Sequence, residues 1–265
     1  MVNVITQKQL REVRDLSFCH VCGKSFSTDD KTDHDHVPPQ ACFERSDRDP
    51  PLKLRTHVAC NNANKLNDEK VGQLIAAQRR KAIDPAASRL RIEVLREDTS
   101  GKLYAGFDNL DVVGAIRRWI GGFHAALYGA PLTGETPYTI TPPLPRARVS
   151  ASGVVEYPIP PHYRLFVESL KLNRAAENLD VLITSNGKLR YECVWTPDDT
   201  GVNWLCIFAL DIYDWIGLGD GKNFEARGCV GCYLAPAAGV PAGGTRATKL
   251  SAKFANEAPL NPFGK

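Results

Sequence analysis

The sequence lacks several features that would place it in a specialised class. Its 265 residues carry 33 Lys and Arg against 30 Asp and Glu, so overall charge does not mark a nucleic-acid binder. No run of 18 apolar residues is present, which argues against a membrane helix. Residues 1–15 are too polar for a secretion signal. We therefore expect a cytoplasmic protein with no membrane partner.

Cysteine is well represented, with eight residues. In the absence of a secretion signal, we expect a reducing compartment, where thiols bind metal more often than they pair as disulfides. Composition alone still allows a disulfide-bonded protein. The spacing of the cysteines therefore matters more than their number.

The chain divides into three segments of different character. Residues 1–82 are rich in Cys and His, residues 83–235 mix helical and strand patterns, and residues 236–265 are rich in Ala, Gly and Pro. We expect a zinc-stabilised N-terminal module, an α+β domain that positions substrate or a partner, and a flexible tail. The fold class is therefore α+β.

Periodicity predicts several elements within the middle segment. Apolar residues at helical spacing predict a helix that begins at Asn109 and stops at Gly129. The proline-rich stretch 131–145 is interpreted as a loop, and Asn186-Gly187 predicts the turn of a hairpin over 181–195. Further strands are expected at 89–95, 163–167 and 204–213.

Two pairs of metal-ligand residues share the same spacing. Cys19 and Cys22 are separated by two residues, as are His57 and Cys60, and Gly23 eases the turn after the first pair. Four such ligands suit a closed tetrahedral zinc site. We expect a structural Zn²⁺ that stabilises a module too small to fold alone. Unmetallated core thiols and a surface His remain the alternative.

Between and after these pairs lie the polar residues that suggest chemistry. An Asp-His pair, Asp35-His36, precedes Val-Pro-Pro, and Asn61 directly follows Cys60. In this order and spacing, residues 16–70 resemble the HNH endonucleases, which belong to the ββα-metal nucleases. The resemblance implies a strand carrying Asp35 and His36, a second strand near 52–56 and a helix from about Cys60.

The resemblance also implies a role for each residue. Asp35 and Asn61 would hold a catalytic divalent ion, and His36 would act as general base. Hard oxygen ligands suit Mg²⁺ or Mn²⁺. Two departures from the family pattern stand out: Asn61 replaces the usual last His, and the middle Asn, which orients the base in the family, is missing from 49–54.

Other residues compete for these roles or extend the site. His34 is a rival base, but we expect it to face away from His36, and Cys42 is interpreted as a packing residue. Basic residues near the module are candidates for phosphate contact. The first choices are Lys53, Arg55 and Lys65, and a solvated helix end is an equal alternative for Arg79, Arg80 and Lys81.

Residues beyond the module are mostly given structural interpretations. Arg117 and Arg118 can bind phosphate, but the amphipathic helix is complete without them, and a lone His124 on that helix is more often structural. A second zinc site is a minority interpretation, and the tryptophans are expected in the core. The residues concerned are Cys193, Cys206, Cys229 and Cys232, and Trp195, Trp204 and Trp215.

The function predicted from the sequence is metal-dependent hydrolysis of DNA phosphodiester bonds. Two alternatives stay open: a zinc-stabilised nucleic-acid-binding module without cleavage, and a nuclease that acts mainly on RNA. Cleavage preference, oligomeric state and protein partners are not encoded in any motif of this chain.

Overall fold

The computed structural model describes residues 1–79, 91–96, 103–108, 110–132, 136–141, 148–149, 155–156, 161–197, 204–213, 229–235 and 244–247. Its helices are α1 (Gln7–Glu12), α2 (Val58–Gln78), α3 (Val112–Tyr128) and α4 (Pro161–Ala175). Its strands are β1 (Asn3–Val4), β2 (Thr32–His36), β3 (Lys53–His57), β4 (Arg91–Arg96), β5 (Leu103–Asp108), β6 (Tyr138–Thr141), β7 (Arg148–Val149), β8 (Val155–Glu156), β9 (Asp180–Thr184), β10 (Leu189–Pro197), β11 (Trp204–Ile212) and β12 (Cys229–Ala235).

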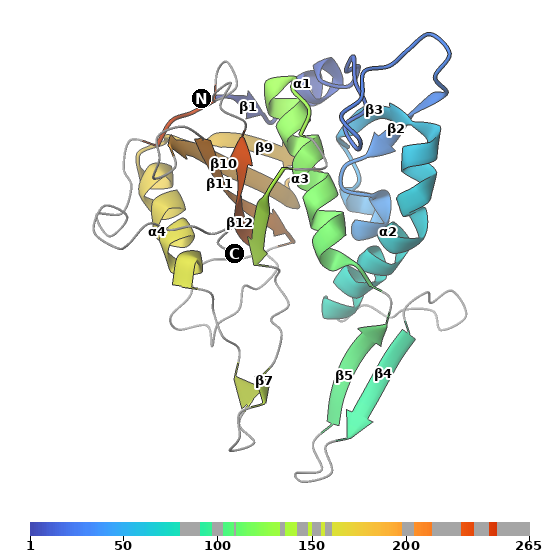
Figure 1. Cartoon of the computed structure of the whole chain (residues 1–265), viewed down its shortest axis with the longest axis vertical. Coiled ribbons are helices and arrows are strands. Elements are labelled where there is room, and N and C mark those ends of the chain that lie inside the picture. Colours follow the sequence, from blue (N-terminus) through green and yellow to red (C-terminus); the bar gives the residue numbers. More distant parts are fainter. Residues whose placement is uncertain are drawn as a thin grey trace.

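A six-stranded sheet forms one side of the molecule, and its strands run in the order β1-β9-β10-β11-β12-β6. Helix α4 packs on one face of the sheet, and α3 packs on the other. The β2–β3 hairpin and α2 lie beyond α3 (Figure 1). The pairs β4–β5 and β7–β8 form separate two-stranded sheets. The fold is α+β, as expected.

The N-terminal part folds as a hairpin followed by a helix. Strands β2 and β3 pair in antiparallel register from Thr32 opposite His57 to His36 opposite Lys53. Helix α2 follows β3 without an intervening loop and packs on both strands. The expected order is therefore present: a strand with Asp35 and His36, a second strand near 52–56 and a helix that begins near Cys60. Within the described ranges, no helix is both long and apolar enough to cross a membrane.

Helix α3 is the most deeply buried helix of the described chain. Asp111 caps its N-terminus by accepting a 2.7 Å hydrogen bond from the Gly114 amide, and Gly129 ends it with a φ of 63°, in the left-handed region. Nearly every residue from Ala115 to Leu127 is buried, because the sheet lies on one side of the helix and α2 on the other. Asn109, the expected start, lies outside the described residues.

One hydrophobic cluster extends through the predicted boundary at residue 82. It contains Leu54 and Val71 of the N-terminal part together with Trp119 of α3 and Tyr191 of the sheet. In addition, β1 pairs in parallel with β9, so the first residues of the chain belong to the large sheet. The described parts of the two predicted domains therefore share a core.

Asp180, at the edge of this core, gathers three distant segments. Its fully buried carboxylate accepts hydrogen bonds from the Val2 amide at 2.6 Å, from the Tyr128 hydroxyl at 2.7 Å and from the Thr245 amide at 2.7 Å. Residues 244–247 also pair with β10 through hydrogen bonds to Trp195. The expectation of a flexible tail over 236–265 is therefore wrong for residues 244–247, and the rest of that segment lies outside the described residues.

The other helices, strands and loops expected in residues 83–235 are confirmed only in part. The hairpin is confirmed, because β9 and β10 pair across a turn with left-handed Asn186 and Gly187. The strands near 89–95 and 204–213 are also present, as β4 and β11. The strand expected at 163–167 is wrong, because these residues lie within α4. The loop expected over 131–145 contains a strand, β6. A short apolar run alone does not distinguish strand from buried helix.

The contact between α3 and the N-terminal part is tightest at two adjacent glycines. A β carbon at Gly122 would lie 2.7 Å from Val37 Cγ1 and 3.4 Å from His20 Cδ2. A β carbon at Gly121 would meet only the His20 carbonyl oxygen, at an ordinary 3.5 Å. The two positions differ in available space while sharing the same helix.

This difference predicts opposite effects on stability. We expect Gly122→Ala to lower the free energy of unfolding by about 1–3 kcal/mol, because Val37 must move to admit the methyl group. The matched variant Gly121→Ala should be neutral or more stable by up to about 1 kcal/mol, since Ala favours the helix. Urea unfolding monitored by circular dichroism measures both. Equal stability of the two variants would contradict the close packing at Gly122.

Candidate metal centre and neighbouring polar site

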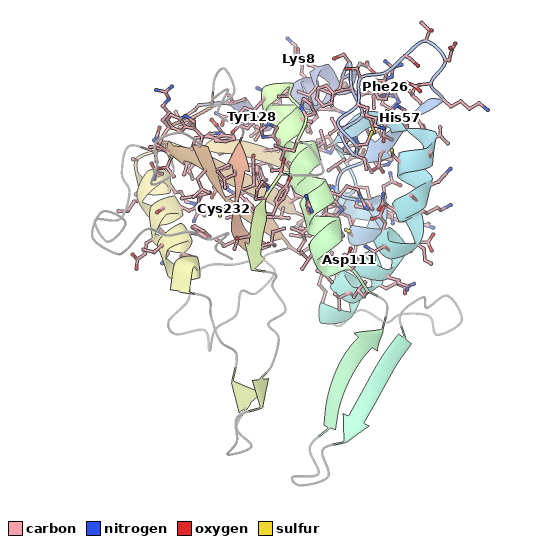
Figure 2. The ribbon with its side chains drawn as sticks, viewed as in Figure 1. Lys8, Phe26, His57, Asp111, Tyr128 and Cys232 are labelled. Carbon is pink, nitrogen blue, oxygen red and sulfur yellow. The ribbon has the colours of Figure 1, made fainter. Side chains whose placement is uncertain are left out.

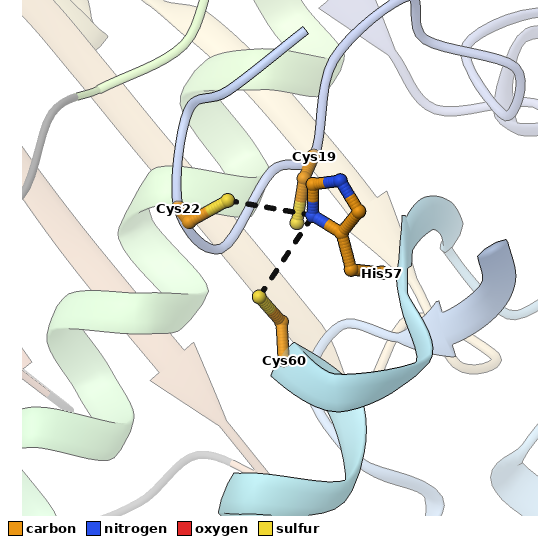
Figure 3. A group of neighbouring side chains, drawn as sticks. All are labelled: Cys19, Cys22, His57 and Cys60. Carbon is orange, nitrogen blue, oxygen red and sulfur yellow. Dashed lines mark hydrogen bonds between the residues drawn. The ribbon is translucent and has the colours of Figure 1, made fainter. Parts of the chain in front are cut away.

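The first pair of candidate metal ligands lies on a tight loop. The Gly23 amide donates to the Cys19 carbonyl at 2.8 Å, and the Cys19 amide donates to the Lys24 carbonyl at 2.9 Å. Gly23 has a φ of 74°, a left-handed conformation that glycine adopts without strain. This turn brings the Cys19 and Cys22 side chains to the same side of the loop (Figure 3).

The second pair lies where β3 continues into α2. His57 is the last residue of β3, and Cys60 is in the first turn of α2. The four ligand atoms all lie within 4.8 Å of one another, and His57 Nδ1 is 3.5 Å from Cys22 Sγ and 3.9 Å from Cys60 Sγ (Figure 3). Separations of this size match ligands about 2.0–2.3 Å from a shared tetrahedral ion. The cluster can hold a metal ion such as zinc.

Asp30 faces the other nitrogen of the His57 ring. Its Oδ2 atom lies 3.4 Å from His57 Nε2 and accepts a 2.7 Å hydrogen bond from the Ser27 amide. Hydrogen bonds from Ser27 lower the pKa of Asp30, so the carboxylate is charged. A carboxylate in this position directs Nδ1 toward the thiols. Sequence reasoning missed Asp30 because it belongs to no spaced motif.

The thiols of the cluster differ in acidity. At Cys19 burial raises the pKa, but hydrogen bonds from Thr56 and from backbone amides outweigh it and bring the pKa to about 6. At Cys60 burial and the neighbouring Cys19 and Cys22 raise the pKa to about 12. Mutual repulsion thus opposes full ionisation of the thiols. A bound cation would relieve it, because thiolates are the ligands that metals bind.

The Asp-His pair lies at the end of β2. Asp35 is 9% exposed and faces the interior, where its Oδ2 atom is 3.6 Å from Nε2 of the buried His20. His36 is half-buried and pairs across the hairpin with Lys53. Adjacent residues of a strand point to opposite faces, which explains the different environments of Asp35 and His36. His20 and its contact with Asp35 were missed from the sequence.

Gln40 contacts the imidazole of His36. The Gln40 side-chain amide lies 2.9 Å from His36 Nε2, so the two groups form one hydrogen bond. Burial and the positive charge of Lys53 lower the pKa of His36, with Asp35 acting in the opposite direction. The imidazole is therefore neutral near pH 7. Gln40 therefore orients the His36 ring, a contact that the sequence did not predict.

His34 lies on the same strand as His36 but has different neighbours. The expectation that it faces away from His36 is wrong, because residues two apart in a strand share a face. His34 Nε2 lies 3.1 Å from Asp15 Oδ1, and His34 Nδ1 accepts from Arg14 at 3.2 Å. These contacts join the hairpin to the segment after α1, which is a structural role.

Asn61 and the expected phosphate contacts surround the start of α2. Asn61 is partly exposed in the first turn, and in the described structure its side chain makes no hydrogen bond. Lys65 is exposed one turn further along α2. Arg55 instead packs over the Phe26 ring at 4.4 Å and donates to Thr32 Oγ1 at 3.3 Å. Lys53 and Lys65 are thus freer than Arg55 to meet a phosphate.

Several other basic and histidine side chains have partners within the protein. Arg79 forms a 2.7 Å ion pair with Glu44 and stacks on Tyr213, and Arg118 pairs with the buried Asp68. The remaining two are Arg117, which donates to the Thr136 carbonyl, and His124, whose Nδ1 bonds the Tyr233 hydroxyl at 2.9 Å. The structural interpretations of Arg117, Arg118 and His124 are supported. Arg80 and Lys81 lie outside the described residues.

The four cysteines considered for a second zinc site do not converge. Cys193, Cys206 and Cys229 belong to the core shared with α3, whereas Cys232 belongs to the cluster under α4, on the other face of the sheet. Figure 2 shows His57 and Cys232 on either side of α3.

All eight cysteines are free thiols, so the disulfide alternative is not realised. Cys42 is a buried packing residue, as expected, and so is Trp195, while Trp204 is partly buried and Trp215 lies outside the described residues.

The cluster predicts one firmly bound metal ion per chain. Cys22→Ser should abolish retention of that ion and destabilise residues 16–78, because a hydroxyl is a poor substitute for a thiolate. Cys42→Ala, which alters a buried thiol outside the cluster, should retain it. Metal content after gel filtration, measured by plasma mass spectrometry, tests this. A full complement of metal in Cys22→Ser would remove Cys22 from the ligand set.

Asp30 should matter for metal affinity without binding the ion itself. We expect Asp30→Ala to weaken metal affinity by roughly 10–100-fold, the usual effect of removing the group that orients a ligand histidine. Competition with a chromogenic chelator measures the change. Asp29→Ala, one residue earlier on the exposed loop, is the matched control. Equal affinities for the two variants would show that His57 needs no carboxylate partner.

Comparisons with family models, with curated proteins and with solved structures give no match. Any function proposed for the chain therefore rests on the chemistry of the site itself.

Proposed function

We propose that the chain is a metal-dependent HNH-type endonuclease that hydrolyses phosphodiester bonds of DNA. The observation that carries this proposal is the order of the site on the fold. An Asp-His pair ends β2, an Asn lies in the first turn of α2, and the Cys/His cluster brings the loop before β2 to the junction of β3 and α2. This is the arrangement that the resemblance of residues 16–70 implies.

His36 is the general base of the proposed reaction. A neutral imidazole can accept a proton from water, and the lowered pKa keeps His36 neutral near pH 7. The Gln40 amide nitrogen donates to Nε2, so in the neutral ring Nδ1 carries the proton and Nε2 is the nitrogen that can accept one, from a water that takes the place of Gln40. Gln40 is thus a positioning residue, because it holds the ring in one orientation. Its role parallels that of the missing Asn.

Asp35 and Asn61 are the proposed protein ligands of the catalytic divalent ion, Mg²⁺ or Mn²⁺. Their oxygens suit a hard cation, and both side chains lack a hydrogen bond in the described structure. When bound, such an ion neutralises charge on the phosphate and on the departing 3′ oxygen. The Cys/His cluster has a separate role, which is to fix the start of α2 against the loop of Cys19–Cys22.

Lys53 and Lys65 are the proposed contacts to the nucleic-acid backbone. Lys53 lies opposite His36 in the hairpin register, and Lys65 is exposed on α2. Lysines at these positions can bind phosphates without reading sequence. Arg55 is a weaker candidate because Phe26 and Thr32 engage its guanidinium. RNA presents the same phosphates, so RNA cleavage and binding without cleavage remain possible outcomes of the assay.

The nuclease proposal predicts a specific pattern of loss. His36→Ala should lower plasmid cleavage by at least ~10²-fold, the usual contribution of a general base, while DNA binding is retained. Asp35→Ala should weaken metal affinity, so that added Mn²⁺ restores part of the rate. Gel assays of supercoiled plasmid with Mg²⁺, and parallel assays with an RNA of equal length, measure these effects.

His34→Ala is the matched control for His36→Ala. His34 lies on the same face of β2 and contacts Asp15 and Arg14, so its loss should leave most of the cleavage rate. If His34→Ala abolishes cleavage while His36→Ala remains active, the base has been assigned to the wrong residue. Binding of DNA with no cleavage by the wild-type chain under any divalent ion would favour the binding-module alternative.

A further inference from the structure

His20 is a buried histidine with a fixed tautomer. It lies between the two cysteines of the loop, is 2% exposed, and packs its Cδ2 edge against Gly122 of α3. Its Nδ1 atom is 3.3 Å from the Arg55 carbonyl oxygen. A carbonyl oxygen only accepts hydrogen bonds, so Nδ1 carries the proton. In the neutral ring, Nε2 therefore presents a lone pair.

That lone pair is directed at another electron-rich atom. His20 Nε2 has no hydrogen-bond partner in the described structure, although it is fully buried. The nearest polar group is the Asp35 carboxylate, whose Oδ2 atom lies 3.6 Å away. A buried nitrogen lone pair that faces a buried carboxylate is unfavourable unless a positive charge lies between them.

We propose that His20 Nε2 and Asp35 Oδ2 are ligands of one divalent cation, separate from the ion of the Cys/His cluster. Two ligand atoms about 2.1 Å from one ion lie about 3.0 Å apart at the 90° angle of a regular octahedron and about 3.4–3.6 Å apart at an opened angle of about 110–120°, which is the geometry required here. The observed separation of 3.6 Å fits this geometry and is too long for a direct hydrogen bond. The proposal adds to the proposed function by sharing Asp35, but binding does not require cleavage.

A histidine ligand determines which metal the site prefers. Imidazole nitrogen suits divalent first-row transition metals, among which Mn²⁺ binds most weakly, whereas Mg²⁺ and Ca²⁺ prefer an all-oxygen set. The site therefore favours Mn²⁺ over Mg²⁺ more strongly than Asp35 and Asn61 alone would. The alternative to a cation between His20 Nε2 and Asp35 Oδ2 is a proton on Nε2, which would give an imidazolium–carboxylate ion pair.

The test measures binding of Mn²⁺ alone to the full chain, with its structural metal in place. Loss of the free Mn²⁺ signal in electron paramagnetic resonance gives the affinity, and competition with Mg²⁺ gives the preference. His20→Gln replaces the ring nitrogen. The matched control is His34→Gln, one residue before Asp35 on β2. Metal content and thermal unfolding report whether each variant keeps its fold.

We expect the wild type and His34→Gln to bind one Mn²⁺ with the same affinity. His20→Gln should bind Mn²⁺ at least about tenfold more weakly and Mg²⁺ with little change, so that the preference is lost. A purely structural role for His20 would weaken both ions equally. That result, or an unchanged Mn²⁺ affinity in His20→Gln, would overturn the proposal.

A second measurement uses the wild type, in case His20→Gln does not fold. In protein with ¹⁵N-labelled histidine, added Mn²⁺ should broaden the His20 Nε2 resonance beyond detection, because the paramagnetic ion is bonded to it. An unbroadened His20 Nε2 signal at saturating Mn²⁺ would refute the ligand assignment.

These outcomes are independent of the nuclease assay. Mn²⁺ binding that depends on His20 without any cleavage would contradict the proposed function and support the cation site. Cleavage with a Mn²⁺ affinity that does not depend on His20 would do the reverse.

Discussion

The close approach of α3 to the loop of Cys19–Cys22 is the constraint on which the arrangement depends. Gly122 lets the helix lie against His20 and Val37, because a β carbon at this residue would collide with Val37. Helix α3 also packs on the six-stranded sheet. Its contact with the loop therefore fixes the Cys/His cluster and the β2–β3 hairpin relative to the sheet. The buried pair of Arg118 and Asp68 ties α3 to α2 in the same interface. Helix α3 therefore supports the polar site through contacts with both the sheet and α2.

Short-range patterns in the sequence predicted much of the N-terminal part. A two-residue gap between ligands is a local property, and so the cluster of Cys19, Cys22, His57 and Cys60 could be assigned without a structure. The order of two strands and a helix was implied by the resemblance of residues 16–70 to a known family. Capping residues marked the end of α3, where Gly129 stops the helix. In each case the chain's own neighbours determine the conformation.

Interactions between distant segments could not be predicted from the sequence. Asp30, Gln40 and His20 belong to no spacing rule, and each contacts its partner only after the loops fold. The pairing of β1 with β9 joins residues far apart in the chain, which the domain boundary at residue 82 did not anticipate. The run 163–167 shows the limit of periodicity, because five residues fit either a strand or a helix. These residues form part of helix α4, which packs on β10, β11 and β12 of the sheet.

The hydrogen bonds of Asp180 have a consequence for synthesis of the protein. They need the Val2 amide as well as the Thr245 amide and hydroxyl, and these two residues are separated by more than 240 positions in the chain. A nascent chain that has released β9 but not Thr245 holds a charged carboxylate with only part of its partners. The native contacts of Asp180 therefore form only after Thr245 has been synthesised.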